Sequence, residues 1–291
     1  MIGIREYNKK IASLKNTKKM TKTMKMVAAS KFKRAHKAQA SALTYSRELT
    51  GLMNRLGDLG GDTSHPLMVK PKAIQNAHIL LLTSDKGLCG GFNNNLIRYV
   101  RAWMVQNQSK YKSINFSFCG KRGFIAFRKS VSVVKNYEGA SAKPSVAYAI
   151  TIGQDLAQVY MTKQCDEVYI AYNHFNSPMS QTPVLERLIP FDSSEIKQEQ
   201  TKTAHADYEF EPESDELYKI LVPKYLNFKI YFCLLENSAG EHGARMTAMD
   251  KATENTGELI DQYILRRNRA RQAAITTELI EIISGAEALN G

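Results

Sequence analysis

Apolar and small residues recur every three or four positions along the last fifth of the chain, residues 236–289. This stretch contains no proline. The recurring positions are Met246, Met249, Ala252, Thr256, Leu259, Ile260, Tyr263, Ile264, Ala270, Ala274, Ile280 and Ile283. Such spacing predicts one long helix that buries a narrow stripe of its surface. Because an α-helix rises 1.5 Å per residue, about 50 residues would span roughly 75 Å, so part of this helix needs a partner outside a compact domain.

The first fifty residues are the expected partner. From Ile4 to Thr50 the chain has neither Pro nor Gly. Its recurring positions are Ile4, Ile11, Leu14, Met20 or Thr21, Met24, Val27 with Ala28, Phe32, Ala35, Ala38 and Ala42. Small residues in both stretches would let two helices approach closely; in the C-terminal one they are Ala239, Gly240, Gly243, Ala244, Ala248 and Ala252. We predict that the two ends pair as an antiparallel coiled coil. The alternative is two ordinary amphipathic helices packed on a globular domain.

The chain between these ends alternates strand-like and helix-like patterns. The strand-like runs are residues 77–84, 113–120, 131–137, 167–175 and 182–191, and the helix-like runs are residues 93–107, 122–129 and 146–163. Strands that alternate with helices predict a mostly parallel, doubly wound sheet. The last two strands flank the turn NSPMSQ and are expected to be antiparallel neighbours. The predicted fold class is therefore α/β.

Breaks in these patterns divide the chain. Pro66 and Pro71 lie in a turn-rich stretch, so the first helix is expected to end near Leu56. A helix resumes near Asp215, and Pro223 is expected to limit or kink it. The predicted division is an N-terminal helix (1–57), a central α/β domain (73–192), an acidic loop (193–214) and a helical segment that ends in the long C-terminal helix (215–291).

Charge is concentrated at the N-terminus. Residues 1–37 hold twelve Lys or Arg residues and one acid, Glu6, so they carry +11 of a net charge of +12. A basic helix of this kind indicates an anionic partner, which could be nucleic acid, an acidic membrane surface or acidic loops of another protein. No run of apolar residues is long enough to cross a bilayer, and no apolar segment of a secretory signal follows the basic start.

The sequence shows no assembled active site. The loop at residues 84–92 follows the first strand, where open α/β sheets bind ligands, but it lacks both GxxxxGK[ST] and GxGxxG. Cys89 in this loop has no His placed nearby that could act as its base, so we interpret it as a structural thiol. The four cysteines form no CxxC pair and the six histidines show no metal spacing. We predict a non-enzymatic chain without a cofactor.

Three separated motifs resemble one family, the gamma subunit of F-type ATP synthase. They are IASLKNTKKMTKTMKMVAASKFKRA near the N-terminus, the loop SDKGLCGGFN, and ARMTAMDKATENTGELID with NRARQAAITTELIEIISGAEAL near the C-terminus. The resemblance covers nearly the whole chain in the same order. It implies a long antiparallel coiled coil plus a central Rossmann-like domain. It also implies a rotor that couples proton-driven rotation of the c-ring to conformational cycling of the catalytic beta subunits.

The resemblance also implies contact residues. Met24, with Lys18, Lys22 and Lys25, would lie near acidic loops of the catalytic subunits. Further expected contact residues are Arg245, Gln272 and Thr276 against a loop of a beta subunit, Ile280 and Ile283 in the apolar tip that the ring would enclose, and Lys86, Leu88 and Cys89 at the foot of the rotor. The implied partners are the alpha and beta subunits, the epsilon subunit and the c-ring, with no nucleic acid and no direct membrane insertion.

The resemblance also implies where the protein is located. The shaft helix starts almost at Met1, so we expect no presequence, as in a bacterial chain or in a mature or organelle-encoded one. The expected location is that of a peripheral membrane protein at the cytoplasmic face of a bacterial inner membrane. The dithiol switch of photosynthetic members has no counterpart here, so redox regulation of that kind is not expected.

The alternative is a nucleic-acid-binding protein with a basic helical hairpin, although Met and Ala rather than stacking aromatics separate its charges. A stand-alone dinucleotide enzyme lacks its fingerprint.

Overall fold

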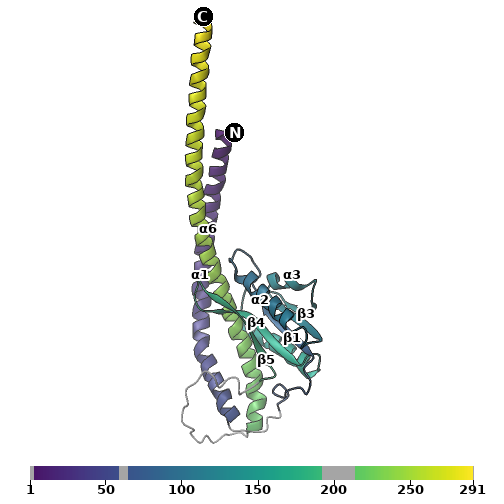
Figure 1. Ribbon diagram of the computed structural model, residues 1–291. Helices are drawn as coiled ribbons and strands as arrows, with labels where there is room; N and C mark the ends of the chain where they lie inside the picture. The colour runs from purple at the N-terminus through teal and green to yellow at the C-terminus, as the bar shows by residue number, and fades with distance from the viewer. Residues whose placement is uncertain (1–2, 59–64, 192–213, 291) are drawn as a thin grey trace. The chain divides into compact units, whose positions relative to one another are not determined.

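The computed structural model describes residues 3–58, 65–191 and 214–290. Its elements, labelled in Figure 1, are α1 (Ile4–Asp58), β1 (Asn76–Leu82), α2 (Phe92–Gln106), β2 (Ser113–Cys119), α3 (Lys121–Phe127), β3 (Ser132–Tyr137), α4 (Val146–Met161), β4 (Glu167–Phe175), β5 (Gln181–Ile189) and α6 (Ser214–Asn290). The predicted order of helices and strands is confirmed. The acidic loop predicted at 193–214 lies, except for its last residue, outside the described residues, and the predicted domain boundaries stay a prediction.

The chain divides into two compact units. The coiled-coil unit comprises residues 1–28 and 246–291, and the α/β unit comprises residues 29–245. Each of the two long helices contributes one segment to each unit.

A five-stranded sheet with the order β3-β2-β1-β4-β5 forms the centre of the α/β unit. The pairs β1–β2, β2–β3 and β1–β4 are parallel, and β4–β5 is antiparallel. This confirms the mostly parallel sheet and the antiparallel final pair. From β1 the chain adds β2 and β3 on one side of the sheet, and then β4 and β5 on the other side of β1. The strand order therefore reverses between β1 and β4, and the loop after β1 begins at this topological switch point.

Both faces of the sheet are covered, which explains the continuous apolar run of β1. Successive side chains of a strand point to opposite faces. Ile79 and Leu81 pack with α2 and α3, where the rings of Phe116, Phe118 and Phe127 stack at centroid distances of 5.3 to 6.4 Å. The alternate β1 residues, with α4 and the 218–234 segment of α6, form the other core. The unit therefore has three layers, helices–sheet–helices (Figure 1).

Pro223 was expected to limit or kink the last helix, and the expectation that it limits the helix is wrong. A proline inside a helix removes one backbone hydrogen bond and crowds the preceding turn. α6 nevertheless continues through Pro223. Tyr218, Val222, Leu226 and Ile230 on the two sides of it are buried in the core, and this packing holds the helix together.

Two of the glycines among the small residues of α6 lie against the central domain, and one of these also lies against α1. A Cβ atom on Gly240 would lie 3.0 Å from the ring of Phe92 and 3.3 Å from Gln181, both in the central domain. A Cβ on Gly243 would lie 3.0 Å from the Cα of Pro178 and 3.5 Å from the ring of Phe32 in α1. Close helix–helix approach therefore applies only in part: these glycines mainly let the central domain approach α6.

The coiled-coil unit pairs its two segments antiparallel, as predicted. Lys25 Nζ lies 2.6 Å from Asp250 Oδ1, Thr253 Oγ1 donates to Thr21 Oγ1 at 2.7 Å, and the ring centroids of Tyr7 and Tyr263 are 6.2 Å apart. The residue numbers rise along one helix as they fall along the other, which defines an antiparallel register.

Burial decides between the alternative positions of the N-terminal stripe. Thr21 is 9% exposed and Met20 is 64% exposed, and Ala28 is buried whereas Val27 is not. On α6, Ile260 is buried and Leu259 is exposed. Among the described side chains of the unit, the buried ones are Ile11, Thr21, Ala28, Met249, Thr256 and Ile260. Thr21 and Ala28 follow Ile11 at heptad-like spacing, so the stripe is small and partly polar.

Candidate functional site

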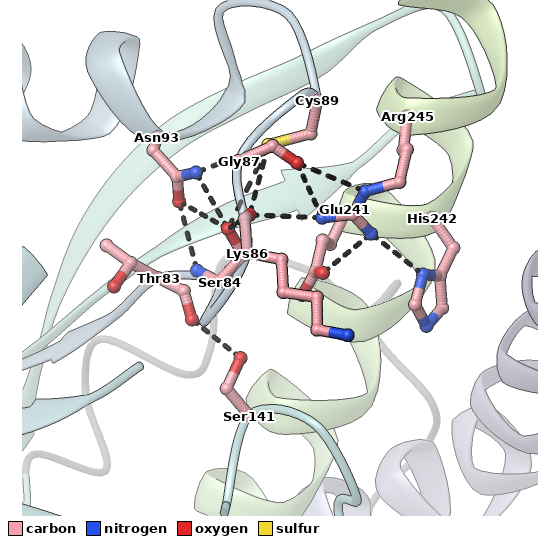
Figure 2. Close-up of polar contacts among 10 residues, drawn as sticks. All are labelled: Thr83, Ser84, Lys86, Gly87, Cys89, Asn93, Ser141, Glu241, His242 and Arg245. Carbon is pink, nitrogen blue, oxygen red and sulfur yellow. Dashed lines mark hydrogen bonds and ion pairs between the residues drawn. The ribbon is translucent and has the colours of Figure 1, made fainter. Parts of the chain in front are cut away.

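The loop after β1 is held to α2 by a cluster of polar side chains. Asn93 accepts from the backbone N–H of Ser84 at 3.0 Å, and its amide nitrogen donates to Ser84 Oγ at 2.7 Å (Figure 2). Ser84 Oγ in turn donates to the Lys86 carbonyl at 2.7 Å. At the root of the loop, Ser141 Oγ donates to the Thr83 carbonyl at 2.6 Å. The cluster fixes both ends of the loop, as a short strand-to-helix turn requires.

Cys89 points inward from this loop. Its side chain is buried with Phe92 and Ala244, and Asn93 Nδ2 donates to its sulfur at 3.2 Å. Burial raises the pKa of the Cys89 thiol, and the Ser84 hydroxyl and Arg245 lower it only in part. A protonated, buried thiol is a poor nucleophile. The position agrees with the structural interpretation, and a partner would touch the neighbours of Cys89 rather than its sulfur.

Leu88 and Lys86 form the outer face of the loop. The Leu88 side chain is 63% exposed, and its backbone has a φ of 63°. A left-handed conformation costs a residue with a Cβ about 1–2 kcal/mol, so the contacts around the loop must maintain it. Lys86 is also exposed. These two side chains are the parts of the predicted foot loop that another molecule can reach.

Arg245 on α6 binds the same loop from the other side. Its Nε and Nη2 atoms donate to the Gly87 carbonyl at 3.3 and 3.2 Å, and Nη2 also donates to the Lys86 carbonyl at 3.1 Å (Figure 2). Its Nη1 atom lies 2.7 Å from Glu241 Oε1 and 3.3 Å from His242 Nδ1. The Arg245 side chain is only 12% exposed. The residue that the resemblance assigns to a beta-subunit contact is thus bound within its own chain.

Two neighbours on α6 complete this cluster. Burial raises the pKa of Glu241, and the guanidinium of Arg245 lowers it in part. Burial, with Arg245 and Lys31 nearby, lowers the pKa of His242 to about 4. His242 is therefore neutral at pH 7, and because Arg245 can only donate, His242 Nδ1 must be the acceptor. The sequence analysis missed Glu241, although its spacing of four residues before Arg245 is that of a helical ion pair.

The predicted residues of the coiled-coil unit lie mostly on its surface. Lys18 and Lys22 are exposed and Met24 is half-buried. Lys25 is paired with Asp250, and such a partly exposed pair contributes about 0–1 kcal/mol. The structure does not gather these residues into a pocket; they follow successive turns of one helix.

The C-terminal predicted residues are exposed as well. Gln272 and Thr276 share one helical turn, where Thr276 Oγ1 donates to the Gln272 carbonyl at 3.0 Å. From Ile275 onward, five apolar side chains are 46–67% exposed: Ile275, Leu279, Ile280, Ile282 and Ile283. A run of exposed branched apolar residues on one helix indicates a surface that another protein covers.

Two further polar features lie in the α/β unit. Glu167, whose side chain is 2% exposed, accepts hydrogen bonds from Tyr111, Tyr169 and Lys110, the last at 3.0 Å. A cavity of about 780 Å³ lies between α1, β4–β5 and α6. Both carboxylates on its wall are paired within the chain: Glu186 with Lys229 at 2.7 Å and Glu236 with His174 at 3.2 Å. The carboxylates at both places are therefore paired with groups of the same chain.

The described residues contain no group of three or more His, Cys, Asp or Glu side chains that could hold a metal ion. Across the same described ranges, no helix has the length and apolar character needed to cross a membrane.

Comparison with known proteins gives full-length matches. The profile of the family described as "ATP synthase" matches residues 3–289. The ATP synthase gamma chains of Geobacter metallireducens and Geotalea daltonii are 38% and 39% identical over 291 residues, covering all of both chains in each case. A rotor structure of the Euglena gracilis mitochondrial ATP synthase has a TM-score of 0.64 at 19% identity, with 94% of this chain and 98% of that chain covered. The central stalk and c-ring structure from Tetrahymena thermophila has a TM-score of 0.56 at 24% identity, with 80% and 99% covered. The structural likenesses support the fold, and the sequence matches identify the family.

Proposed function

The chain belongs to the ATP synthase gamma chain family, and on that premise we propose that it is the rotor of such an enzyme. As a rotor it is a non-catalytic subunit of the complex. It couples proton-driven rotation of a c-ring to conformational cycling of the catalytic beta subunits, in the direction of synthesis or of hydrolysis.

The observation that carries the proposal is the uncovered end of α6. Of the described ring and polar contacts between the two helices, the one nearest the N-terminus joins Tyr7 to Tyr263. The apolar residues from Ile275 to Ile283 lie beyond it, exposed on a single helix. A helix end of this kind needs a surrounding partner, and a sleeve formed by the tops of alpha and beta subunits supplies one.

The mechanism follows from the asymmetry of the coiled-coil unit. A pair of unlike helices presents a different surface in each direction, so three otherwise equivalent catalytic sites around it meet different contacts. On the α1 side the contacts come from Lys18, Lys22 and Met24, and on the α6 side from Gln272 and Thr276. A contact that favours one conformation of a beta subunit biases its nucleotide affinity, and the coupling is reciprocal. Ion flow supplies about 2.3 kcal/mol per elementary charge per 100 mV.

The α/β unit provides the second set of contacts. Its exposed loop side chains, Lys86 and Leu88, belong to the foot of the rotor, next to the epsilon subunit and the c-ring. Attachment to the membrane is indirect, through the c-ring. The chain is therefore a peripheral protein at the cytoplasmic face of a bacterial inner membrane, without direct membrane insertion and without nucleic acid as its partner.

Reconstitution tests this proposal. Purified alpha and beta subunits are assayed for ATP hydrolysis at physiological salt with and without the full chain. We expect strong turnover only with the chain present, and its loss when residues 1–25 and 270–291 are both removed. As a control, the truncated chain must keep the unfolding transition of the α/β unit. A chain that neither joins the ring nor changes its turnover, and that holds RNA at the same salt, would establish the basic-hairpin alternative instead.

A further inference from the structure

The hydrogen bonds of Arg245 point to a role different from direct contact with a partner. We propose that Arg245 is a positioning residue, which fixes the conformation of the loop at residues 85–91 and acts on partner subunits through that loop. This inference rests on the proposed rotor function for its effect on turnover, but the loop contacts themselves do not depend on that function.

The first argument is the number of donors. An arginine side chain has five N–H groups in a fixed fork. Among the described residues, the guanidinium of Arg245 makes five contacts with four acceptor groups, two of them carbonyls of the loop: the Gly87 carbonyl twice, the Lys86 carbonyl, Glu241 and His242. The side chain is 12% exposed (Figure 2). A partner carboxylate would have to displace one of these acceptors before it could bind the guanidinium.

The second argument is the orientation of the two acceptors on α6. Glu241 lies one turn before Arg245 and its side chain is 8% exposed, so its carboxylate is directed at Nη1 within the protein. The neutral His242 ring accepts from the same Nη1 atom. These two residues hold the guanidinium plane so that its other edge, Nε and Nη2, faces the loop carbonyls. A side chain oriented by neighbours in this way is built to hold something else in place.

The third argument is the loop conformation. The two carbonyls that Arg245 binds belong to the residues immediately before Leu88, whose φ is 63°. A left-handed leucine persists only where its surroundings determine the backbone on both sides. Arg245 fixes the side before Leu88, and the buried Cys89, which accepts from Asn93, fixes the side after it. The result is an exposed Leu88, which is the surface that a partner can reach.

Amide exchange in the isolated full chain tests the positioning role directly. Arg245→Gln removes the fork, and Arg245→Lys keeps the charge but replaces the planar fork of five donors by a single nitrogen with three. We expect the backbone amides of residues 86–91 to exchange at least about tenfold faster in both variants, with β1 and β2 unchanged. The matched control is Arg266→Gln, an exposed arginine of the same helix that lies over the Tyr263 ring. Unchanged exchange in residues 86–91 would overturn the proposal.

A double-mutant cycle in the reconstituted ring tests how the effect travels. The variants are Arg245→Gln, Leu88→Ala and both together, with ATP turnover as the readout. If Arg245 acts through the loop, the double variant is no more than about twofold slower than the slower single variant. If the two fold-changes multiply, Arg245 and Leu88 act independently and the proposal is wrong. If wild-type chain gives no turnover with the ring, the rotor function fails, while the exchange result still decides whether Arg245 positions the loop.

Discussion

Replacing Gly120 by alanine should destabilise the α/β unit, although it adds only one methyl group. Gly120 follows β2 directly and has a φ of 102°, a conformation that residues with a Cβ rarely adopt. An added Cβ would lie 2.1 Å from the carbonyl oxygen of Thr83. Thr83 is the first residue after β1, so the overlap occurs at the root of the polar loop, and backbone rather than a flexible side chain would have to move.

The magnitude can be worked from these contacts. The left-handed conformation costs about 1–2 kcal/mol once a Cβ is present. Relief of the overlap separates the ends of β1 and β2, where the Thr83 N–H donates to the Cys119 carbonyl at 2.8 Å. Loss of such a hydrogen bond costs a further 0.5–1.5 kcal/mol or so. The free energy of unfolding should therefore fall by about 1.5–3.5 kcal/mol, which for a unit of this size corresponds to a Tm lower by roughly 3–14 °C.

The control is the same substitution at Gly51 in α1. Apart from the neighbouring residues and backbone of α1 itself, no atom of the described residues lies within 4 Å of a Cβ added there. Because alanine is about 1 kcal/mol more favourable than glycine inside a helix, Gly51→Ala should stabilise the protein. Urea unfolding of both variants, followed by the fluorescence of Trp103 in α2, measures the predicted decrease and the predicted increase in the free energy of unfolding with one assay. Equal stability of Gly120→Ala and the wild type, within about 0.5 kcal/mol, would refute the reasoning, since neither the overlap nor the backbone strain would then be real.

Three further predictions concern other parts of the chain. In the coiled-coil unit, Ile260→Ala should lower the free energy of unfolding by about 2–4 kcal/mol because the side chain is buried, whereas Leu259→Ala should lower it little. Thermal unfolding compares the two variants, and equal losses of stability would contradict the register. Burial raises the pKa of Glu167, but hydrogen bonds from Tyr111 and Lys110 outweigh this effect, so the pKa in the folded chain is below that in the unfolded chain. Glu167 therefore stabilises the fold above its unfolded pKa, and this stabilisation disappears as the pH falls through the folded pKa. In Glu167→Gln, the free energy of unfolding in urea should depend less on pH below about pH 5, and an unchanged pH profile would refute this. The four buried cysteines should react with a thiol reagent slowly in the folded chain and rapidly in urea, and one fast thiol in the folded chain would contradict the structural interpretation of Cys89.

Local pattern was sufficient for most of the fold. The helix and strand order follows from periodicity, because buried strands such as β1 are continuously apolar and the paired helices repeat every three or four residues. The antiparallel β4–β5 pair was predictable from the short turn between its strands. The continuation of α6 through Pro223 was not, because it depends on tertiary burial of residues around the proline and not on the propensity of the proline itself.

The candidate site was only partly predictable. Motif resemblance identified Arg245 and the 84–92 loop separately, and nothing in their sequence separation indicates that they are bonded to each other. Gly240 illustrates the same limit: a small residue indicates a close approach, but the pattern does not say that the approaching group is the ring of Phe92. Contacts between distant parts of the chain depend on the three-dimensional arrangement, which spacing along the sequence does not contain.

Rotation of the chain inside its ring is the most direct test of the central claim. The alpha and beta subunits are fixed to a surface, the chain is labelled through a cysteine introduced at an exposed position such as Lys129 of the α/β unit, and the label is observed under ATP. The account predicts unidirectional rotation in steps of one third of a turn, which stops when ATP is withdrawn. ATP hydrolysis by the assembled ring with the label stationary, or turning without a preferred direction, would contradict the claim that this chain is the rotor.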